Sequence, residues 1–155
     1  MEIDFAGISY NVKGLRRTNK RIKIFNYLKE KFKKCVVLLQ ETHSTNDDLE
    51  SWSNKMGYKI LLNNGTSNNC GTLIGISKKI EYKILHYYDD KQGRLQLLAS
   101  EHNGQKFLIV NIYNENIEKY QVLLLKKLNE QLEKIDDIIN FQIVIGGDWN
   151  FALDK

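Results

Sequence analysis

Three apolar segments of this chain lead directly into polar residues of the kinds used in catalysis, and this pattern constrains the fold most. Residues 141–145 are mainly apolar and lead into Gly146-Gly147-Asp148-Trp149-Asn150. Asn11 follows residues 8–10, and Gln40-Glu41-Thr42-His43 follows residues 36–39. In α/β folds the carboxyl ends of strands are where chemistry is placed. One such ending is common, but three of them predict an α/β fold with a functional site at the strand ends.

The length and composition predict a single globular domain. The chain has 155 residues, of which 42% are hydrophobic and 27% charged, which is enough to bury a core. No apolar run approaches the roughly 20 residues of a membrane span, and no secretory hydrophobic segment is visible. Cys35 and Cys70 have neither a metal-ligand spacing nor a disulfide framework. We therefore expect an intracellular protein in a reducing compartment, without a membrane partner.

The basic character of the chain is concentrated in residues 13–34. This stretch carries ten Lys or Arg and the single acid Glu30, whereas the residues after it carry 13 bases and 16 acids. A basic patch attracts nucleic-acid phosphates through counterion release, although a lysine-rich helix face is also a common solvated surface. Charge alone leaves both interpretations open.

Hydrophobic periodicity and turn residues predict alternating strands and helices. A helix is expected from Thr18 or Asn19, either of which can cap it, and a second helix is expected to end at Gly57. Asn103-Gly104 predicts a hairpin turn, because both residues tolerate positive φ. The expected strands are 4–12, 35–40, 58–62, 71–77, 81–88, 95–101, 106–112 and the segment ending at Asp148; the expected helices are 18–34, one opened by a capping box at 44–47, and 115–138.

Two of the polar endings carry carboxylates with a plausible chemical role. Glu41 follows four apolar residues, so its charge needs either a Lys or Arg partner or a cation such as Mg2+, which prefers oxygen ligands. Asp148 and Asn150 can together orient a water and hold a phosphoryl oxygen, and Gly146 and Gly147 permit a tight turn and close approach to a ligand. The alternative is a turn in which Asp and Asn bond the local backbone.

The remaining candidates are ambiguous when each is taken alone. Asn11 fits either a site or a turn before Gly14, and Tyr113 is either a phenolic donor to phosphate or a half-buried strand aromatic. His43 is either a base or a loop residue before a helix cap. The signatures of P-loop enzymes, serine hydrolases and zincins are absent.

Four ordered motifs give the chain a specific resemblance. They are Ser9-Tyr10-Asn11-Val12-Lys13-Gly14-Leu15, Leu38-Leu39-Gln40-Glu41-Thr42-His43, Asn111-Ile112-Tyr113 and Gly146-Gly147-Asp148-Trp149-Asn150. In this order and spacing they resemble the endonuclease/exonuclease/phosphatase superfamily, and most of all the apurinic-type endonuclease of non-LTR (LINE-like) retrotransposons. Gly93-Arg94 and the glycine-led segment 71–76 also resemble that branch.

The resemblance implies an α/β fold, a DNase I-like two-sheet sandwich, and the hydrolysis of phosphodiesters with Mg2+, with Mn2+ as the alternative metal. It implies that Glu41 binds the metal with support from Asn11, that Tyr113 contacts the phosphate, and that Asp148 and Asn150 orient the attacking water. Lys13 departs from the repair enzymes, which carry an acid at that place. DNA is the implied partner, together with a reverse transcriptase of the same element, and an active retroelement implies a nuclear location. The residues expected to contact DNA are Lys13, Arg16, Arg17, Lys20 and Arg21.

The family also carries a Ser-Asp-His motif whose Asp and His form an acid/base pair. None of His43, His86 and His102 lies in that context. We therefore expect residues 1–155 to form the amino-terminal part of such a domain and to be inactive alone. Three functions stay open: a DNA-nicking endonuclease, a superfamily phosphatase or phosphodiesterase on small substrates, and a non-catalytic or vestigial nucleic-acid-binding protein.

Overall fold

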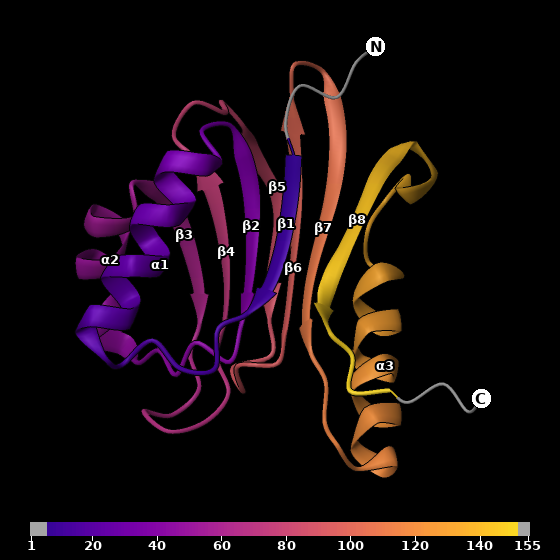
Figure 1. Cartoon of the computed structure of the whole chain (residues 1–155). Coiled ribbons are helices and arrows are strands. Elements are labelled where there is room, and N and C mark those ends of the chain that lie inside the picture. Colours follow the sequence, from indigo (N-terminus) through magenta and orange to yellow (C-terminus); the bar gives the residue numbers. More distant parts are fainter. Residues whose placement is uncertain (1–5, 152–155) are drawn as a thin grey trace.

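Two four-stranded sheets pack face to face, with helices on both outer faces (Figure 1). The computed structural model describes residues 6–151. The strand order is β1-β2-β4-β3 in the first sheet and β5-β6-β7-β8 in the second. The predicted two-sheet α/β sandwich is confirmed.

The elements of the sandwich, in chain order, are β1 (Ala6–Asn11), α1 (Thr18–Lys31), β2 (Cys35–Gln40), the short 3-10 helix η1 (Asn46–Asp48), α2 (Leu49–Met56), β3 (Tyr58–Asn63), β4 (Thr72–Ser77), β5 (Lys83–Asp89), β6 (Leu95–His102), β7 (Gln105–Tyr113), α3 (Glu118–Leu132), the 3-10 helix η2 (Ile138–Asn140) and β8 (Phe141–Asp148).

Three apolar clusters hold these four layers together. One lies between the first sheet and the helices α1 and α2, where Phe25 meets Trp52 edge to face. The second joins the other sheet to α3 through Leu124 and Leu128. The third lies between the two sheets and includes Leu38. Every residue of β2 is buried, as its apolar residues 35–39 predict for a strand covered on both faces.

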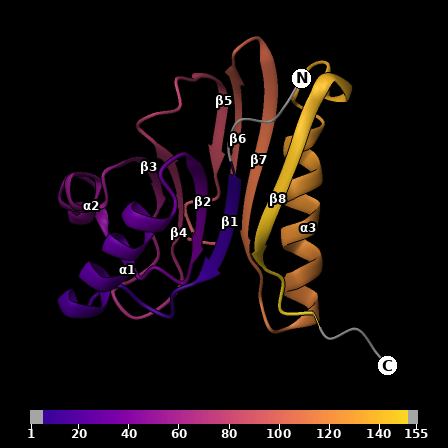
Figure 2. The same ribbon diagram turned by 45° about the horizontal axis from the view of Figure 1, so that its top comes forward.

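Each sheet contains one parallel pair built around a crossover helix. β1 and β2 are parallel and connected through α1, and β7 and β8 are parallel and connected through α3. Figure 2 shows the strands in the middle of the molecule with α1 and α2 on one outer side and α3 on the other. β1 and β8, each at the end of the strand order of its sheet, contact each other. The carboxyl ends of the two parallel pairs therefore meet at one end of the molecule, which explains how polar residues far apart in sequence come together.

Helix boundaries differ from the sequence-based expectations. The helix α1 ends at Lys31 rather than Lys34, and Arg17 occupies its N-cap without a side-chain bond, so the predicted cap by Thr18 or Asn19 is wrong. The capping box is formed by Thr45 and Asp48 and opens η1, one residue later than expected. The helix α3 spans only Glu118–Leu132 of the expected 115–138. Asp137 then adopts a left-handed conformation that turns the chain into η2.

Two turn predictions are confirmed by backbone geometry. Asn103 and Gly104 have φ values of 50° and 75° between β6 and β7, as a type I′ hairpin requires. Gly57 ends α2 in the left-handed region with φ 73°.

The edge strands β1 and β8 are more exposed than a core strand. Within residues 6–151, each pairs with one neighbour in its own sheet. Tyr10, Ile143 and Ile145 present large apolar side chains to solvent there. An open strand edge beside apolar side chains favours pairing with another chain. In the described part of the chain, no helix is long and apolar enough to cross a membrane.

Candidate active site

The first and last polar motifs meet at the carboxyl ends of β1 and β8. Asn11 donates from its side-chain amide to one carboxylate oxygen of Asp148 at 2.8 Å. The other carboxylate oxygen accepts the backbone N–H of Asn150 at 3.2 Å. The side-chain oxygen of Asn11 accepts the backbone N–H of Lys13 at 2.9 Å. The Asp148 carboxylate is thus held in one orientation by Asn11, 137 positions away in the chain, and by the backbone of Asn150.

Glu41 and His43 lie on a strained loop after β2. Both residues have φ 56°, in the left-handed region that costs a residue with a side chain about 1–3 kcal/mol. The Nε2 atom of His43 is 3.6 Å from a carboxylate oxygen of Glu41 and is buried without a hydrogen-bond partner. A Cβ at Gly14 would lie 2.8 Å from Nδ1 of His43, so glycine is needed where the first motif packs on the imidazole ring. Strained backbone and an unsatisfied polar atom are typical of functional loops.

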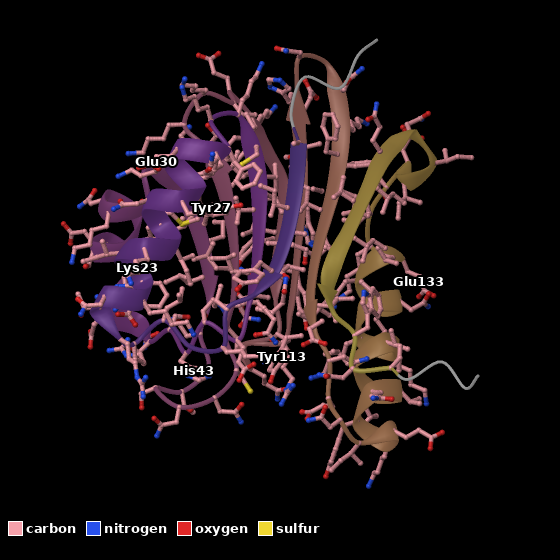
Figure 3. All side chains as sticks on the ribbon, viewed as in Figure 1. Lys23, Tyr27, Glu30, His43, Tyr113 and Glu133 are labelled. Atoms are coloured by element: carbon pink, nitrogen blue, oxygen red, sulfur yellow. The ribbon has the colours of Figure 1, made fainter. Side chains whose placement is uncertain are left out.

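Tyr113 ends β7 beside Asp148, its register partner at the end of β8. Burial raises the pKa of the Tyr113 phenol, and the negative charges of Glu41 and Asp148 raise it further, whereas Arg94 lowers it. Figure 3 shows His43 and Tyr113 at the same end of the sheets, far from Glu133. The phenol therefore stays protonated and is a hydrogen-bond donor at neutral pH. It lies close enough to both candidate carboxylates for their charges to affect it.

A buried polar seam joins the two sheets just below these strand ends. The side-chain amide of Gln40 donates to the side-chain oxygen of Asn111 at 2.7 Å and to the hydroxyl of Ser9 at 3.1 Å. Asn111 in turn donates to the carbonyls of Leu39 and Leu73, both at 3.0 Å. Satisfied polar networks of this kind fix one relative placement of packed elements. Sequence reasoning assigned no role to Gln40 or Asn111, although a polar residue inside an apolar strand was the available signal.

The two glycines before Asp148 have a packing role that the sequence did not reveal. A Cβ at Gly147 would lie 2.1 Å from the carbonyl oxygen of Ile112, and one at Gly146 would lie 2.7 Å from Leu38. These residues therefore permit β8 to pack tightly on β7 and on the first sheet, and Gly147 also lines the groove described below. Because neither glycine has a side chain, β8 fits into a crowded interface, and this position of β8 places Asp148.

A groove of about 540 Å³ opens at this end of the sandwich. Asn11, Gln40, Asp148 and Asn150 contribute to its lining, whereas Glu41 and Tyr113 do not. The groove therefore gives solvent and a ligand access to the Asp148 carboxylate directly, and the Glu41 loop borders the site from the side.

Most bases near the site already have intramolecular partners. Arg16 pairs with Asp48, and Arg21 donates to the carbonyl of Leu15 at 2.7 Å and lies over the Trp52 ring. Lys20 donates to the carbonyl of Lys13 at 2.8 Å. The side chains of Lys13 and Arg17 are exposed. Of the five residues predicted to contact DNA, these two are the most available to an outside anion.

The donor set fits a lightly coordinated Mg2+ ion. Among residues 6–151 no cluster of three or more His, Cys, Asp or Glu side chains surrounds a point that could hold a metal. Mg2+ needs only one or two carboxylates, because it keeps several of its waters. Glu41, a quarter exposed and facing an unsatisfied imidazole nitrogen, has a carboxylate that could serve as one such ligand. A thiolate-binding metal is not indicated, since Cys35 and Cys70 are free thiols whose burial raises their pKa.

Comparison with known proteins supports the same fold. No protein-family model matches the chain. A Xenopus laevis protein described as the transposon TX1 uncharacterized 149 kDa protein is 26% identical over 144 residues, which are 93% of this chain and 11% of that protein. The chain thus spans about a tenth of this relative.

Several solved structures share the architecture. D. rerio TDP2 complexed with single strand DNA product matches 94% of this chain and 60% of its own, with a TM-score of 0.64 and 22% identity. An AP endonuclease from Archaeoglobus fulgidus matches 94% and 57%, with a TM-score of 0.62 and 27% identity. An endonuclease/exonuclease/phosphatase family protein from Bacteroides thetaiotaomicron matches 92% and 62%, with a TM-score of 0.64 and 14% identity. The chain spans less than two thirds of each.

Proposed function

We propose that this chain, which has the fold of the endonuclease/exonuclease/phosphatase superfamily and sequence similarity to a transposon protein, belongs to a Mg2+-dependent DNA-nicking endonuclease of a retroelement. The observation that carries the proposal is the meeting of Asn11, Asp148 and Asn150 across two sheets, with Glu41 and Tyr113 at the same end. The neighbour complexed with single-strand DNA supports DNA as the substrate. This role implies a reverse transcriptase of the same element as partner and the nucleus as the place of action.

The site residues divide the work of phosphodiester hydrolysis. Glu41 would hold the metal, with the side-chain oxygen of Asn11 in support, and a bound Mg2+ would supply positive charge to the phosphoryl and leaving oxygens. Asp148 is fixed by two hydrogen bonds, so it can hold an attacking water in line without reorganising. Tyr113 stays neutral because its pKa is raised, and it can donate to a phosphate oxygen.

The first prediction concerns the metal. Mg2+ should bind weakly to the wild-type chain, and Glu41→Gln should abolish the binding, because the remaining ligands are mainly water. Calorimetric or NMR titration with Mg2+, and then with Mn2+, measures this. Glu30→Gln, which removes an exposed acid on α1, is the control and should bind as the wild type does. Equal binding by Glu41→Gln would show that the ion is held elsewhere.

The second prediction concerns DNA. Binding to duplex or single-stranded DNA should be tolerant of sequence and should weaken with salt, and the double variant Lys13→Ala/Arg17→Ala should reduce the log-log salt slope by about two units. Fluorescence anisotropy at several salt concentrations measures the slope. The matched control is Lys78→Ala/Lys79→Ala, which removes two exposed lysines just after β4, at the other end of the first sheet. A slope that falls equally in both variants would assign the effect to net charge rather than to a DNA contact.

A further inference from the structure

The loop between β5 and β6 connects the two halves of the candidate site through backbone hydrogen bonds. The carbonyl of Gly93 accepts the N–H of Gly71 at 3.0 Å, and the carbonyl of Gly71 accepts the N–H of Thr42 at 2.9 Å. Thr42 lies between Glu41 and His43. The loop is thus connected, through Gly71 just before β4, to the segment that carries the candidate metal ligand.

On its other side, the same loop contacts the end of β7 through Arg94. The Arg94 guanidinium donates to the carbonyls of Tyr113 at 3.3 Å and Asn114 at 3.2 Å, and pairs with Glu115 at 2.7 Å. It also lies 5.0 Å from the centre of the Tyr113 ring, and its side chain is only 14% exposed. The backbone carbonyl of Arg94 accepts the N–H of Tyr113 at 2.8 Å. Arg94 therefore fixes both the backbone and the ring of Tyr113.

The carbonyl of Asn114 links Arg94 to the last motif. It accepts the side-chain amide of Asn150 at 2.7 Å in addition to the Arg94 guanidinium. The N–H of Asn114 donates to the backbone carbonyl of Asp148 at 2.8 Å. A displacement of Arg94 would therefore be passed to Asn150 through one shared acceptor.

From these contacts we propose that Gly93 and Arg94 form a positioning element that holds the Glu41 loop in register with Tyr113 and Asn150 across the two sheets. The effect of this element on catalysis rests on the proposed function, whereas its role in holding these residues in place does not. Arg94 is not among the residues that line the groove, so it acts through the residues that it holds.

The loop is built to keep this element in place. One carboxylate oxygen of Asp90 accepts the N–H groups of Gln92 and Arg94 and the side-chain amide of Asn63. Gly93 has φ 72°, and a Cβ there would lie 2.4 Å from the nitrogen of Gly71. No side chain fits at that position without breaking the contact to the first sheet.

Arginine is required at position 94 because one planar fork serves three acceptors and a ring face at once. Lysine would keep the charge but, as a point charge on a flexible stem, could not reproduce the fork. Arg94→Lys, which keeps the charge but not the planar fork, therefore tests whether the shape of the side chain is needed.

The test uses the whole chain without metal or DNA, so its outcome is separate from that of the proposed function. In Arg94→Gln and Arg94→Lys, the side-chain amide of Asn150 should exchange its protons about five- to tenfold faster, as expected when a hydrogen bond is weakened. The ring signals of Tyr113 should shift as well. Arg17→Gln, which replaces an exposed arginine, should leave both unchanged. Nitrogen-15 NMR with assigned side-chain amides measures the exchange.

Two further variants keep the test decisive if Arg94→Gln is poorly folded. Guanidinium ion, added far below denaturing concentrations, should restore the Asn150 signal in Arg94→Ala, whereas urea should not. Gly93→Ala should shift the backbone amide of Thr42 through Gly71. An unchanged Asn150 exchange rate in folded Arg94 variants would overturn the role of Arg94, and an unchanged Thr42 signal in Gly93→Ala would overturn the connection to the Glu41 loop.

Discussion

Replacing Gly147 by alanine is expected to lower the free energy of unfolding by roughly 3 kcal/mol or more. The added Cβ would lie 2.1 Å from the carbonyl oxygen of Ile112, so β8 would have to move away from β7. Overpacking a close-packed interface and imposing an unfavourable φ each cost about 1–3 kcal/mol. Denaturant unfolding followed by circular dichroism measures the loss. Because Asp148 follows directly, the variant should also lose the hydrogen bond from Asn11.

Gly104→Ala is the matched control for this prediction. Gly104 also has a positive φ, of 75°, but an added Cβ there meets no atom within 4 Å. Its replacement should cost about 1 kcal/mol, the penalty of the left-handed conformation alone. Similar losses in the two variants would show that β8 adapts easily and that the crowding at Gly147 does not place Asp148.

The second large effect concerns the rate of DNA nicking by these 155 residues. We expect the wild-type chain to nick supercoiled plasmid in Mg2+ no faster than Asp148→Ala does. None of the three histidines hydrogen-bonds to Asp148 in the described residues: His43 faces Glu41, and His102 contacts the carbonyl of Glu81 at the hairpin end of β6. A general acid or base is commonly worth about 10²- to 10⁴-fold, and the members of a catalytic unit are strongly non-additive.

A plasmid-relaxation assay over a range of enzyme concentrations measures this rate. Asp148→Ala purified in parallel reports the background from contaminating nucleases. Nicking by the wild type that Asp148→Ala abolishes would show that an acid/base pair is dispensable here or is supplied by another residue. The wild type should bind metal and DNA whether or not it nicks DNA, because binding depends on other side chains than the acid/base pair that nicking requires.

The sequence by itself determined the architecture and which polar residues end the strands. The apolar residues 35–39 of β2, the Asn103-Gly104 turn and the glycine after α2 are local signals, since a backbone conformation or a burial pattern follows from the residues themselves. The four motifs were recognisable for the same reason, because each is a short run at the end of one strand.

Tertiary contacts decided where the helices end and which partners the lysines and arginines bind. The pattern of α1 continues beyond Lys31, but the chain must turn there to enter the buried strand β2. The ten lysines and arginines of residues 13–34 left a nucleic-acid surface and a solvated helix face both open, and the structure shows Arg16 paired with Asp48 and Arg21 bonded to the carbonyl of Leu15. Neither outcome is visible in a local pattern, because the partners are distant in sequence or belong to the backbone.

Only the tertiary structure decided how the candidate site is held together. The bond between Asn11 and Asp148, the seam between Gln40 and Asn111, and the contacts of Arg94 all join strands of different sheets or different loops. The same holds for Gly146 and Gly147, whose need for a missing side chain arises from neighbouring strands. The sequence determined which residues end the strands, whereas the packing of two twisted sheets determined which of those ends meet, because that depends on contacts between residues far apart in the chain.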